Sequence, residues 1–294
     1  MASYIASTWN NATVLIENEF GGRGTGFLVG RQLGEDAWMV TLVTNKHNLH
    51  RDPAKRQSAK YVKLHLSHRN HKVSPPLLGK YVCNYAKGSP GSTPNPRPWF
   101  VEHPDPDVDV MAFDVSPLFM NWDPQEGLAN GWILETDIAT RKMWDDLDIT
   151  VGEEVMVLGY PIGLSSGHGN HPIVRQGIMA TTVGIPLIED NGAGKTRTSR
   201  AFLVDGAVVP GSSGSPVVLK PVTARLVHGS ITIGISPPIL LGIIAETRFA
   251  PIGGGPQLGF AGLGMAFDSE TILETIHLYP ATGPTLSGQP AVNC

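Results

Sequence analysis

Ser213 lies in a segment with the composition of a catalytic turn, Gly211-Ser212-Ser213-Gly214-Ser215-Pro216, between two apolar runs. A nucleophilic serine needs a tight turn that exposes its hydroxyl, and backbone N–H groups directed at the oxyanion that develops on the substrate. The neighbouring glycines permit such a turn, because they adopt backbone angles barred to other residues. The segment therefore predicts a nucleophile turn whose oxyanion donors are the N–H groups of Gly211 and Ser213. A plain Gly/Ser turn is the alternative.

A histidine and an aspartate stand where a general base and its orienting acid would be expected. His47 ends the apolar run that starts at Leu42, and Asp109 opens the run Asp109-Val110-Met111-Ala112-Phe113. An imidazole can take the proton of a serine hydroxyl, and a buried carboxylate can orient that imidazole and stabilise its charged form. Each residue alone is more often structural, but the order His, Asp, Ser is that of chymotrypsin. We predict a triad of His47, Asp109 and Ser213, with Asp107 as the alternative acid.

Short strands must position these residues. The 34 glycines and 24 prolines favour frequent turns over long helices. Runs rich in Val, Ile, Leu and Thr predict strands over 13–17, 26–31, 38–44, 61–67, 110–115, 154–160, 177–185, 201–205, 215–219, 240–247 and 262–267. One helix is predicted over 269–278, because Asp268 and Ser269 can cap it and Pro280 follows. Strands without intervening helices indicate barrels or sandwiches.

Two long connections and a tail divide the chain. Residues 74–106 are rich in proline and predict a surface excursion, and residues 116–150 would bridge two halves. Residues 281–294 are low in charge and rich in Pro and Gly, so we expect a loose tail. We therefore expect a first half-domain over residues 1–120, a connection over 121–144, a second half-domain over 145–280 and a tail over 281–294.

Taken together, the motifs resemble those of trypsin-like serine peptidases, and most closely the protease domain of the high-temperature-requirement branch. The matching segments, in family order, are Gly24–Val29, Val43–His47, Val155–Gly163, Val174–Ile178, Asp205–Pro210, Leu241–Ile244 and Gly262–Ala266. The resemblance implies an all-β fold of two orthogonal antiparallel six-stranded barrels with a C-terminal helix. It also implies a serine endopeptidase that cleaves protein or peptide substrates without a cofactor, with a regulatory protein as a further expected partner.

The resemblance also implies where the substrate binds. In this family the base of the primary pocket lies six residues before the nucleophile, which here is Ala207, followed by Val208. We assign Ala207, Val208, Ala245 and Glu246 to substrate binding. No carboxylate stands at the base to pair with Lys or Arg, and an unpaired buried cation is costly. We therefore expect cleavage after small or medium apolar residues.

Two departures from the family pattern bear on activity. Ser215 stands where the family usually has glycine, which keeps open the alternative of a catalytically silent fold that acts as a binding or scaffold module. Ser212 stands where trypsin has an acid. In branches activated by N-terminal cleavage, the new terminal amine pairs with that acid. We therefore expect that this chain is not activated in that way.

Composition argues against other classes of function. The chain has 294 residues, a formal net charge of -4 and a pI near 6.2, so no basic surface for nucleic acid is indicated. No apolar stretch approaches the roughly 20 residues that cross a membrane, and the N-terminus does not read as a signal peptide. The two cysteines, Cys83 and Cys294, favour a reducing compartment, and we expect a cytoplasmic protein.

A cluster of histidines, His65, His68 and His71 near His50, is the remaining candidate for a metal site. No Cys or Asp completes a tetrahedral set nearby. We therefore expect solvated histidines and no metal.

Overall fold

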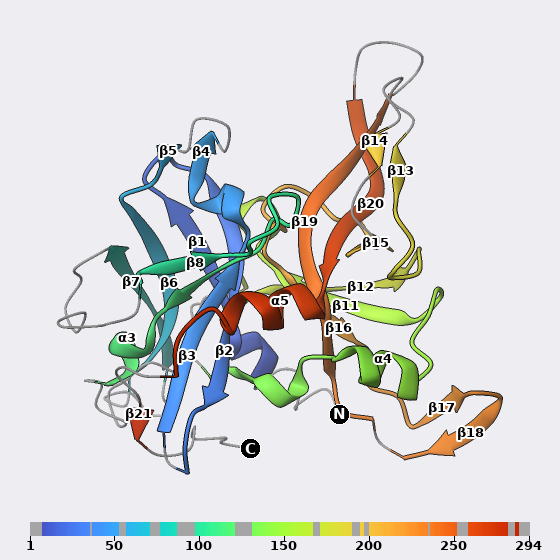
Figure 1. The fold of residues 1–294 in the computed structure, drawn as a ribbon. Helices are drawn as coiled ribbons and strands as arrows, with labels where there is room; N and C mark the ends of the chain where they lie inside the picture. The colour runs from blue at the N-terminus through green and yellow to red at the C-terminus, as the bar shows by residue number, and fades with distance from the viewer. Residues whose placement is uncertain are drawn as a thin grey trace.

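The computed structural model describes residues 8–35, 37–52, 57–70, 77–86, 98–120, 131–166, 171–189, 195–196, 200–234, 236–251, 258–281 and 286–287. Most of the regular structure in these residues is β-strand. The strands form a sheet in the first half of the chain and a closed barrel in the second, seen on the left and right of Figure 1. The mostly β architecture predicted from the sequence is therefore confirmed.

The first half forms a sheet in the order β7-β6-β1-β2-β3-β9-β8. Its strands are β1 (Thr13–Asn18), β2 (Arg23–Gln32), β3 (Ala37–Thr44), β6 (Tyr61–Asn70), β7 (Leu77–Ala86), β8 (Phe100–Glu102) and β9 (Met111–Asp114). Two short strands add to it, since β10 (Ile133–Leu134) pairs with β2 and β21 (Leu286–Ser287) pairs with β3. With these the sheet has nine strands, and its main path is open among the described residues, whereas a six-stranded barrel was expected.

The second half confirms the expected six-stranded barrel, closed in the order β11-β12-β15-β20-β19-β16. Its strands are β11 (Glu154–Gly159), β12 (Ile173–Met179), β15 (Ala201–Asp205), β16 (Pro216–Leu219), β19 (Ile239–Pro251) and β20 (Leu258–Asp268). All pairs within the barrel are antiparallel. Because β15 and β16 are both barrel strands, the predicted nucleophile turn is anchored at both of its ends.

Short elements complete the fold. Three two-stranded pairs join β4 (His50–Asp52) to β5 (Gln57–Ser58), β13 (Ile188–Glu189) to β14 (Lys195–Thr196), and β17 (Ala224–Val227) to β18 (Ser230–Ile233). The helices are α2 (Asn10–Ala12), α3 (Ser116–Met120), α4 (Arg141–Asp146), α5 (Ser269–Ile276) and the 3-10 turns η2 (Lys46–Asn48), η4 (Glu135–Asp137) and η5 (Pro161–Gly163).

Two local predictions need correction. The segment 74–106, expected to be a surface excursion, contributes β7 and β8, which pair along β6 and β9. The strand expected over 177–185 instead covers Ile173–Met179, and the chain turns afterwards around Gly184, whose φ is +91°. The expected loose tail lies outside the described residues, except for residue 281 and β21, which pairs with Trp38 and Ala37.

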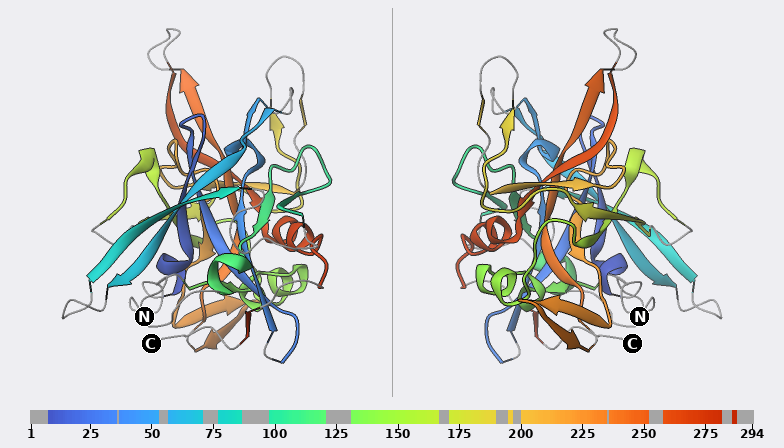
Figure 2. Two further views of the ribbon diagram at one scale, coloured as in Figure 1. Left: turned by 90° about the vertical axis from the view of Figure 1, so that its left-hand side faces the viewer. Right: turned by 90° about the vertical axis from the view of Figure 1, so that its right-hand side faces the viewer.

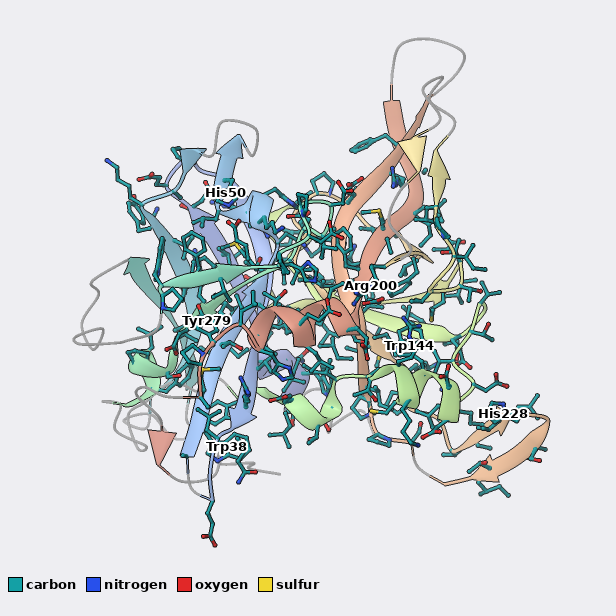
Figure 3. The ribbon with its side chains drawn as sticks, viewed as in Figure 1. Trp38, His50, Trp144, Arg200, His228 and Tyr279 are labelled. Carbon is teal, nitrogen blue, oxygen red and sulfur yellow. The ribbon has the colours of Figure 1, made fainter. Side chains whose placement is uncertain are left out.

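The helix α5 confirms the predicted C-terminal helix and lies across the junction of the two halves. Its N-cap is Asp268, whose side chain accepts a hydrogen bond from the Thr271 N–H. Figure 2 shows α5 and α4 together on one side of the molecule, where Trp144 Nε1 donates to Ser269 Oγ at 3.0 Å. Figure 3 shows Arg200 near the barrel end of α5 and Tyr279 beyond its other end, over the first sheet.

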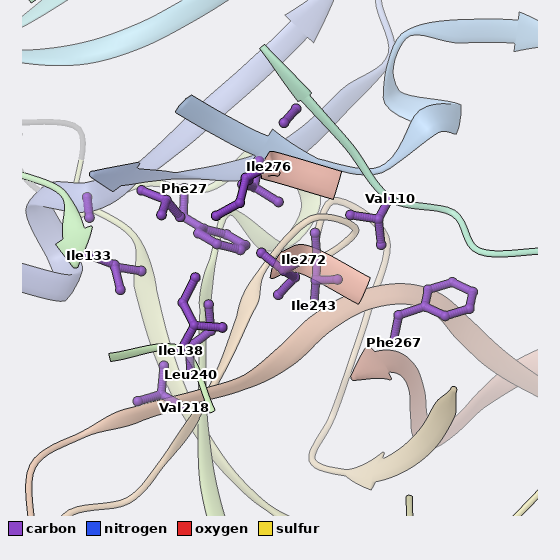
Figure 4. Close-up of a cluster of buried hydrophobic side chains, with 14 of the residues drawn as sticks. Phe27, Val110, Ile133, Ile138, Val218, Leu240, Ile243, Phe267, Ile272 and Ile276 are labelled. Atoms are coloured by element: carbon purple, nitrogen blue, oxygen red, sulfur yellow. The ribbon is translucent and has the colours of Figure 1, made fainter. Parts of the chain in front are cut away.

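One hydrophobic cluster includes residues of both halves. Phe27 from the first sheet, Ile243 and Phe267 from the barrel, and Ile272 and Ile276 from α5 are all buried in it (Figure 4). Two further clusters are each confined to one half of the molecule, one to the first half and one to the second. Because burial of apolar surface is the main favourable term in folding, this shared cluster fixes the two halves relative to each other. The residues that the two halves contribute to the candidate site are therefore held in fixed relative positions.

Candidate active site

The turn that carries Ser213 joins β15 to β16. Ser212 N–H donates to Val209 O at 3.1 Å, and Ser215 N–H donates to Ser212 O at 2.9 Å. Gly214 has φ +86°, and a Cβ placed there would lie 1.7 Å from Thr25 O. Only glycine fits such an approach, so the turn requires Gly214 both for its backbone angle and for its contact with β2.

The Ser213 hydroxyl donates to the backbone carbonyl of Ala245, on β19, at 3.1 Å. The structure therefore brings Ser213 to Ala245, one of the residues assigned to substrate binding. Among the described residues this carbonyl, rather than the His47 ring, accepts the hydrogen bond of the Ser213 hydroxyl.

His47 lies in η2, directly after β3, and Asp109 holds it by two contacts. Its Nδ1 is 2.5 Å from Asp109 Oδ2, and its backbone N–H donates to Asp109 Oδ1 at 3.2 Å. Asp107, the alternative acid, is exposed, and its N–H donates to the Asp105 carboxylate at 2.9 Å. The geometry pairs His47 with Asp109, and Nε2 is the ring nitrogen left to accept a proton.

The surroundings of His47 favour its charged form. Burial lowers the pKa of His47, but the hydrogen bond and charge of Asp109, with the charge of Glu246, outweigh burial and raise it above its usual value. A base whose conjugate acid is stabilised by a carboxylate suits proton transfer from a hydroxyl.

Asn45 and Lys46, which precede His47, hold the segment that carries Asp109. Asn45 Nδ2 donates to Asp109 O at 2.7 Å, and Lys46 Nζ donates to the carbonyls of His103 and Asp105 at 2.9 and 3.0 Å. Burial lowers the pKa of Lys46 despite the nearby carboxylates. Sequence reasoning missed these roles, because neither residue type indicates a partner about sixty residues away.

Contacts from the first sheet cross to the nucleophile turn. Thr25 N–H donates to Ser213 O at 2.7 Å, and Thr25 Oγ1 donates to Gly211 O at 2.9 Å. Asn48 Nδ2 also approaches Ser213 O, at 3.3 Å. The turn is thus held by both halves of the molecule. The sequence offered no signal for Thr25 beyond its place in a glycine-rich strand.

The predicted oxyanion donors are unoccupied by the protein. Within the part of the chain that the structure describes, neither Gly211 N–H nor Ser213 N–H has an acceptor. The preceding carbonyl, Pro210 O, is occupied by the N–H of Ile162 at 2.6 Å. Gly211 has φ +88°, and a Cβ there would lie 2.5 Å from Tyr160 O. Two backbone donors separated by one intervening residue can stabilise a developing oxyanion.

The residues assigned to substrate binding differ in exposure. Ala207 is exposed and has the unusual φ of +45°, and Glu246 is half-buried with its Oε2 3.6 Å from Arg248 Nη1. Val208 and Ala245 are buried. Val208 packs so closely on Gly264 that a Cβ there would lie 2.5 Å from Val208 Cγ2. Side-chain surface is therefore available at Ala207 and Glu246, while Ala245 offers its carbonyl.

The described residues show neither a metal site nor a membrane-spanning helix. Across the described ranges, no group of three His, Cys, Asp or Glu side chains is arranged to hold a metal ion. The expectation of solvated histidines is wrong for His65, which is buried inside the first sheet's strand β6, and His50 Nε2 lies 2.5 Å from Glu102 Oε1. The side chain of His68 and all of His71 fall outside what the structure describes. No helix in the described ranges is long and apolar enough to cross a membrane.

Comparison with known proteins gave matches in family and in structure. The Rv3671c protease from M. tuberculosis, in its inactive form, is 18% identical, with a TM-score of 0.47 over 93% of this chain and 91% of that chain. Deg5 is 16% identical, with a TM-score of 0.49 over 92% and 90%, and the HtrA-type protease AlgW, solved with a decapeptide, is 12% identical, with a TM-score of 0.45 over 94% and 66%.

No curated protein sequence matches the chain significantly. The family model for the trypsin-like peptidase domain matches residues 24–221, which contain all three residues of the predicted triad. This match covers more than half of the chain, and the chain therefore belongs to the trypsin-like peptidase family.

Proposed function

We propose that the protein is a serine endopeptidase with Ser213 as nucleophile, His47 as general base and Asp109 as orienting acid. The observation that carries this proposal is that the Asp109 carboxylate makes hydrogen bonds with both the ring and the backbone N–H of His47. An imidazole fixed in this way presents Nε2 in one orientation, as a general base requires. The unengaged N–H groups of Gly211 and Ser213 supply the second part of the machinery.

In the proposed reaction, His47 Nε2 takes the hydroxyl proton as Ser213 Oγ attacks the substrate carbonyl. The developing oxyanion accepts hydrogen bonds from Gly211 and Ser213 N–H. His47 then gives its proton to the leaving amine, which departs and leaves an acyl-enzyme. In the second step His47 takes a proton from the attacking water and returns it to Ser213 Oγ as the acyl group leaves. For the attack, the Ser213 hydroxyl must turn away from Ala245 O, which leaves that carbonyl free to accept a backbone N–H of the substrate.

The proposed substrates are proteins or peptides cleaved after small or medium apolar residues. Ala207 offers a methyl group at the expected base of the pocket, and Val208 is buried beneath it. Neither could pair with a cationic side chain, and desolvation of an unpaired cation is unfavourable. Profiling with a peptide library checks this, and a dominant preference for Lys or Arg would contradict it.

The function is tested by covalent labelling of the intact chain with a fluorophosphonate probe. Wild type should be labelled at Ser213, and Ser213→Ala should be neither labelled nor active on peptides. Ser212→Ala and Ser215→Gly are matched controls that should keep substantial labelling. Loss of labelling in Ser212→Ala alone would show that the nucleophile has been assigned to the wrong serine.

The second candidate function is that of a catalytically silent binding module. The hydrogen bond from Ser213 to Ala245 O, instead of to His47, favours it. A wild-type chain that stays unlabelled, but binds peptides through the same surface, would support this function against the first.

A further inference from the structure

Arg175, on β12, joins the predicted pocket base to the nucleophile turn. Its Nη1 donates to Ala207 O at 2.7 Å, and its Nη2 donates to Ser212 Oγ at 2.8 Å. Ser212 is fully buried and directly precedes Ser213. One planar guanidinium thus fixes both ends of the segment 207–212, which also contains the oxyanion donor Gly211.

This segment needs an external support. Ala207, which is not a glycine, has the positive φ of +45°. For a residue with a side chain this backbone conformation is sparsely populated, and it persists only where the surrounding structure determines it. Within 207–212 the backbone makes one hydrogen bond of its own, from Ser212 N–H to Val209 O. The remaining support comes from side chains and strands outside the segment. Among the hydrogen bonds of the described residues, those of Arg175 alone reach both ends.

The charge of Arg175 has no acid beside it in the described part of the chain. Among the described residues Arg175 forms no ion pair with a carboxylate, and its Nε has no acceptor. Burial lowers the pKa of Arg175, but an arginine stays protonated in proteins. Burial of a cation is costly, and hydrogen bonds made by its donors offset part of that cost. The two contacts with Ala207 and Ser212 therefore account for the position of this side chain.

We propose that Arg175 is a positioning residue that holds the segment 207–212 in its active conformation. The proposal rests on the proposed function of Ser213. Through Ser212 and Ala207, Arg175 keeps the N–H groups of Gly211 and Ser213 directed at the oxyanion. In trypsin-like branches activated by cleavage, a newly cut N-terminal amine pairs with the acid that precedes the nucleophile. Here the guanidinium of Arg175 takes the place of that amine, and the neutral hydroxyl of Ser212 takes the place of that acid.

The test compares Arg175→Leu, Arg175→Lys and Ser212→Ala with a matched control, Arg225→Leu. Arg225, on the hairpin strand β17, also lacks an acceptor for Nε among the described residues, but its Nη1 contacts Glu153 Oε1 at 2.7 Å, in an ion pair that does not involve the turn. Two readouts are measured on the full chain: the rate of fluorophosphonate labelling, and amide hydrogen exchange over residues 205–215.

Arg175→Leu should slow labelling by roughly tenfold to a hundredfold, because loss of one oxyanion donor costs at least that much. Exchange over 205–215 should become faster, with little change in the rest of the barrel. Arg175→Lys should recover part of both losses, since an ammonium can reach one of the two acceptors. Ser212→Ala should cost less than Arg175→Leu, and should cost nothing further when combined with it. Arg225→Leu should leave the labelling rate unchanged.

Labelling and exchange at wild-type levels in Arg175→Leu would overturn the proposal. So would losses of labelling in Arg175→Leu and Arg225→Leu that both simply follow their melting temperatures. If wild type itself is not labelled, the proposed peptidase function fails, and the exchange measurement still decides whether Arg175 holds the segment.

Discussion

At the scale of single residues, the orientation of His47 depends on one carboxylate. Both oxygens of Asp109 contact His47, whereas Asp107 is exposed and contacts its own loop. Asp109→Asn should lower kcat/KM on a peptide by on the order of 10⁴, because the amide favours the wrong tautomer of the imidazole. Asp107→Asn is the matched control and should stay close to wild type. The opposite ranking of the two variants would reassign the acid.

The pKa of His47 gives a second prediction. Only the unprotonated imidazole can act as base, so kcat/KM should rise with pH through a pKa that lies above the usual histidine value. Glu246→Gln removes a negative charge that stabilises the imidazolium. The pKa should therefore fall, and the acid limb of the pH profile should move to lower pH. The exposed Asp145→Asn serves as control, and a limb that stays in place or moves to higher pH in Glu246→Gln contradicts the assignment.

The sequence predicted residues that occur in local patterns and missed those defined by distant partners. Ser213 stands among glycines, and His47 and Asp109 each adjoin an apolar strand, so their types and positions could be interpreted together. Thr25 and Arg175 act on atoms more than thirty residues away. Nothing in their neighbouring residues distinguishes them from ordinary strand residues, and such partners become visible only when the register of the strands is known.

At the scale of elements, the apolar strands β3, β15 and β16 were predicted closely, whereas the strand β7 was missed. β3, β15 and β16 are apolar and bounded by turn residues, and their predicted positions lie within about a residue of the structure. β7, which carries Lys80 and Asn84, was missed, because its stability comes from pairing with β6 along its whole length. A strand of this kind is specified by its neighbour rather than by its own sequence.

The helix α5 offers a stability test at the same scale. Ile276 is fully buried in the cluster shared by both halves, whereas Leu278, two residues on, is 46% exposed. Ile276→Ala should lower the free energy of unfolding by about 3 kcal/mol, through lost burial and the cavity left behind. Leu278→Ala should change it by less than about 1 kcal/mol. Urea denaturation measures both, and equal effects would show that α5 does not anchor the junction.

At the scale of the whole molecule, the site exists only when both halves are folded and joined. His47 and Asp109 come from the first half and Ser213 from the second, while Thr25 N–H reaches across to Ser213 O at 2.7 Å. The shared cluster and α5 hold the same junction. Changes at the junction, far from Ser213 in the sequence, should therefore reduce activity as well as stability.

The N-terminal segment provides the last prediction, which concerns activation. Trp9 is 1% exposed within the shared cluster, and its carbonyl accepts a hydrogen bond from Thr13 Oγ1 at 2.8 Å. Trp9 is thus already buried without any cleavage, and Ser212 carries no charge that could receive a terminal amine. The intact chain should therefore be labelled by the fluorophosphonate probe without prior cleavage.

Removal of residues 1–7 should leave labelling unchanged. Trp9→Ala should lower the free energy of unfolding by about 3 to 5 kcal/mol, as expected for a large buried aromatic side chain. A cut that removes Trp9 as well should therefore reduce activity by unfolding the junction, instead of increasing it. The comparison requires full-length protein whose mass has been verified. An intact chain that stays unlabelled until a defined N-terminal segment is cut away would show that this peptidase is a zymogen after all.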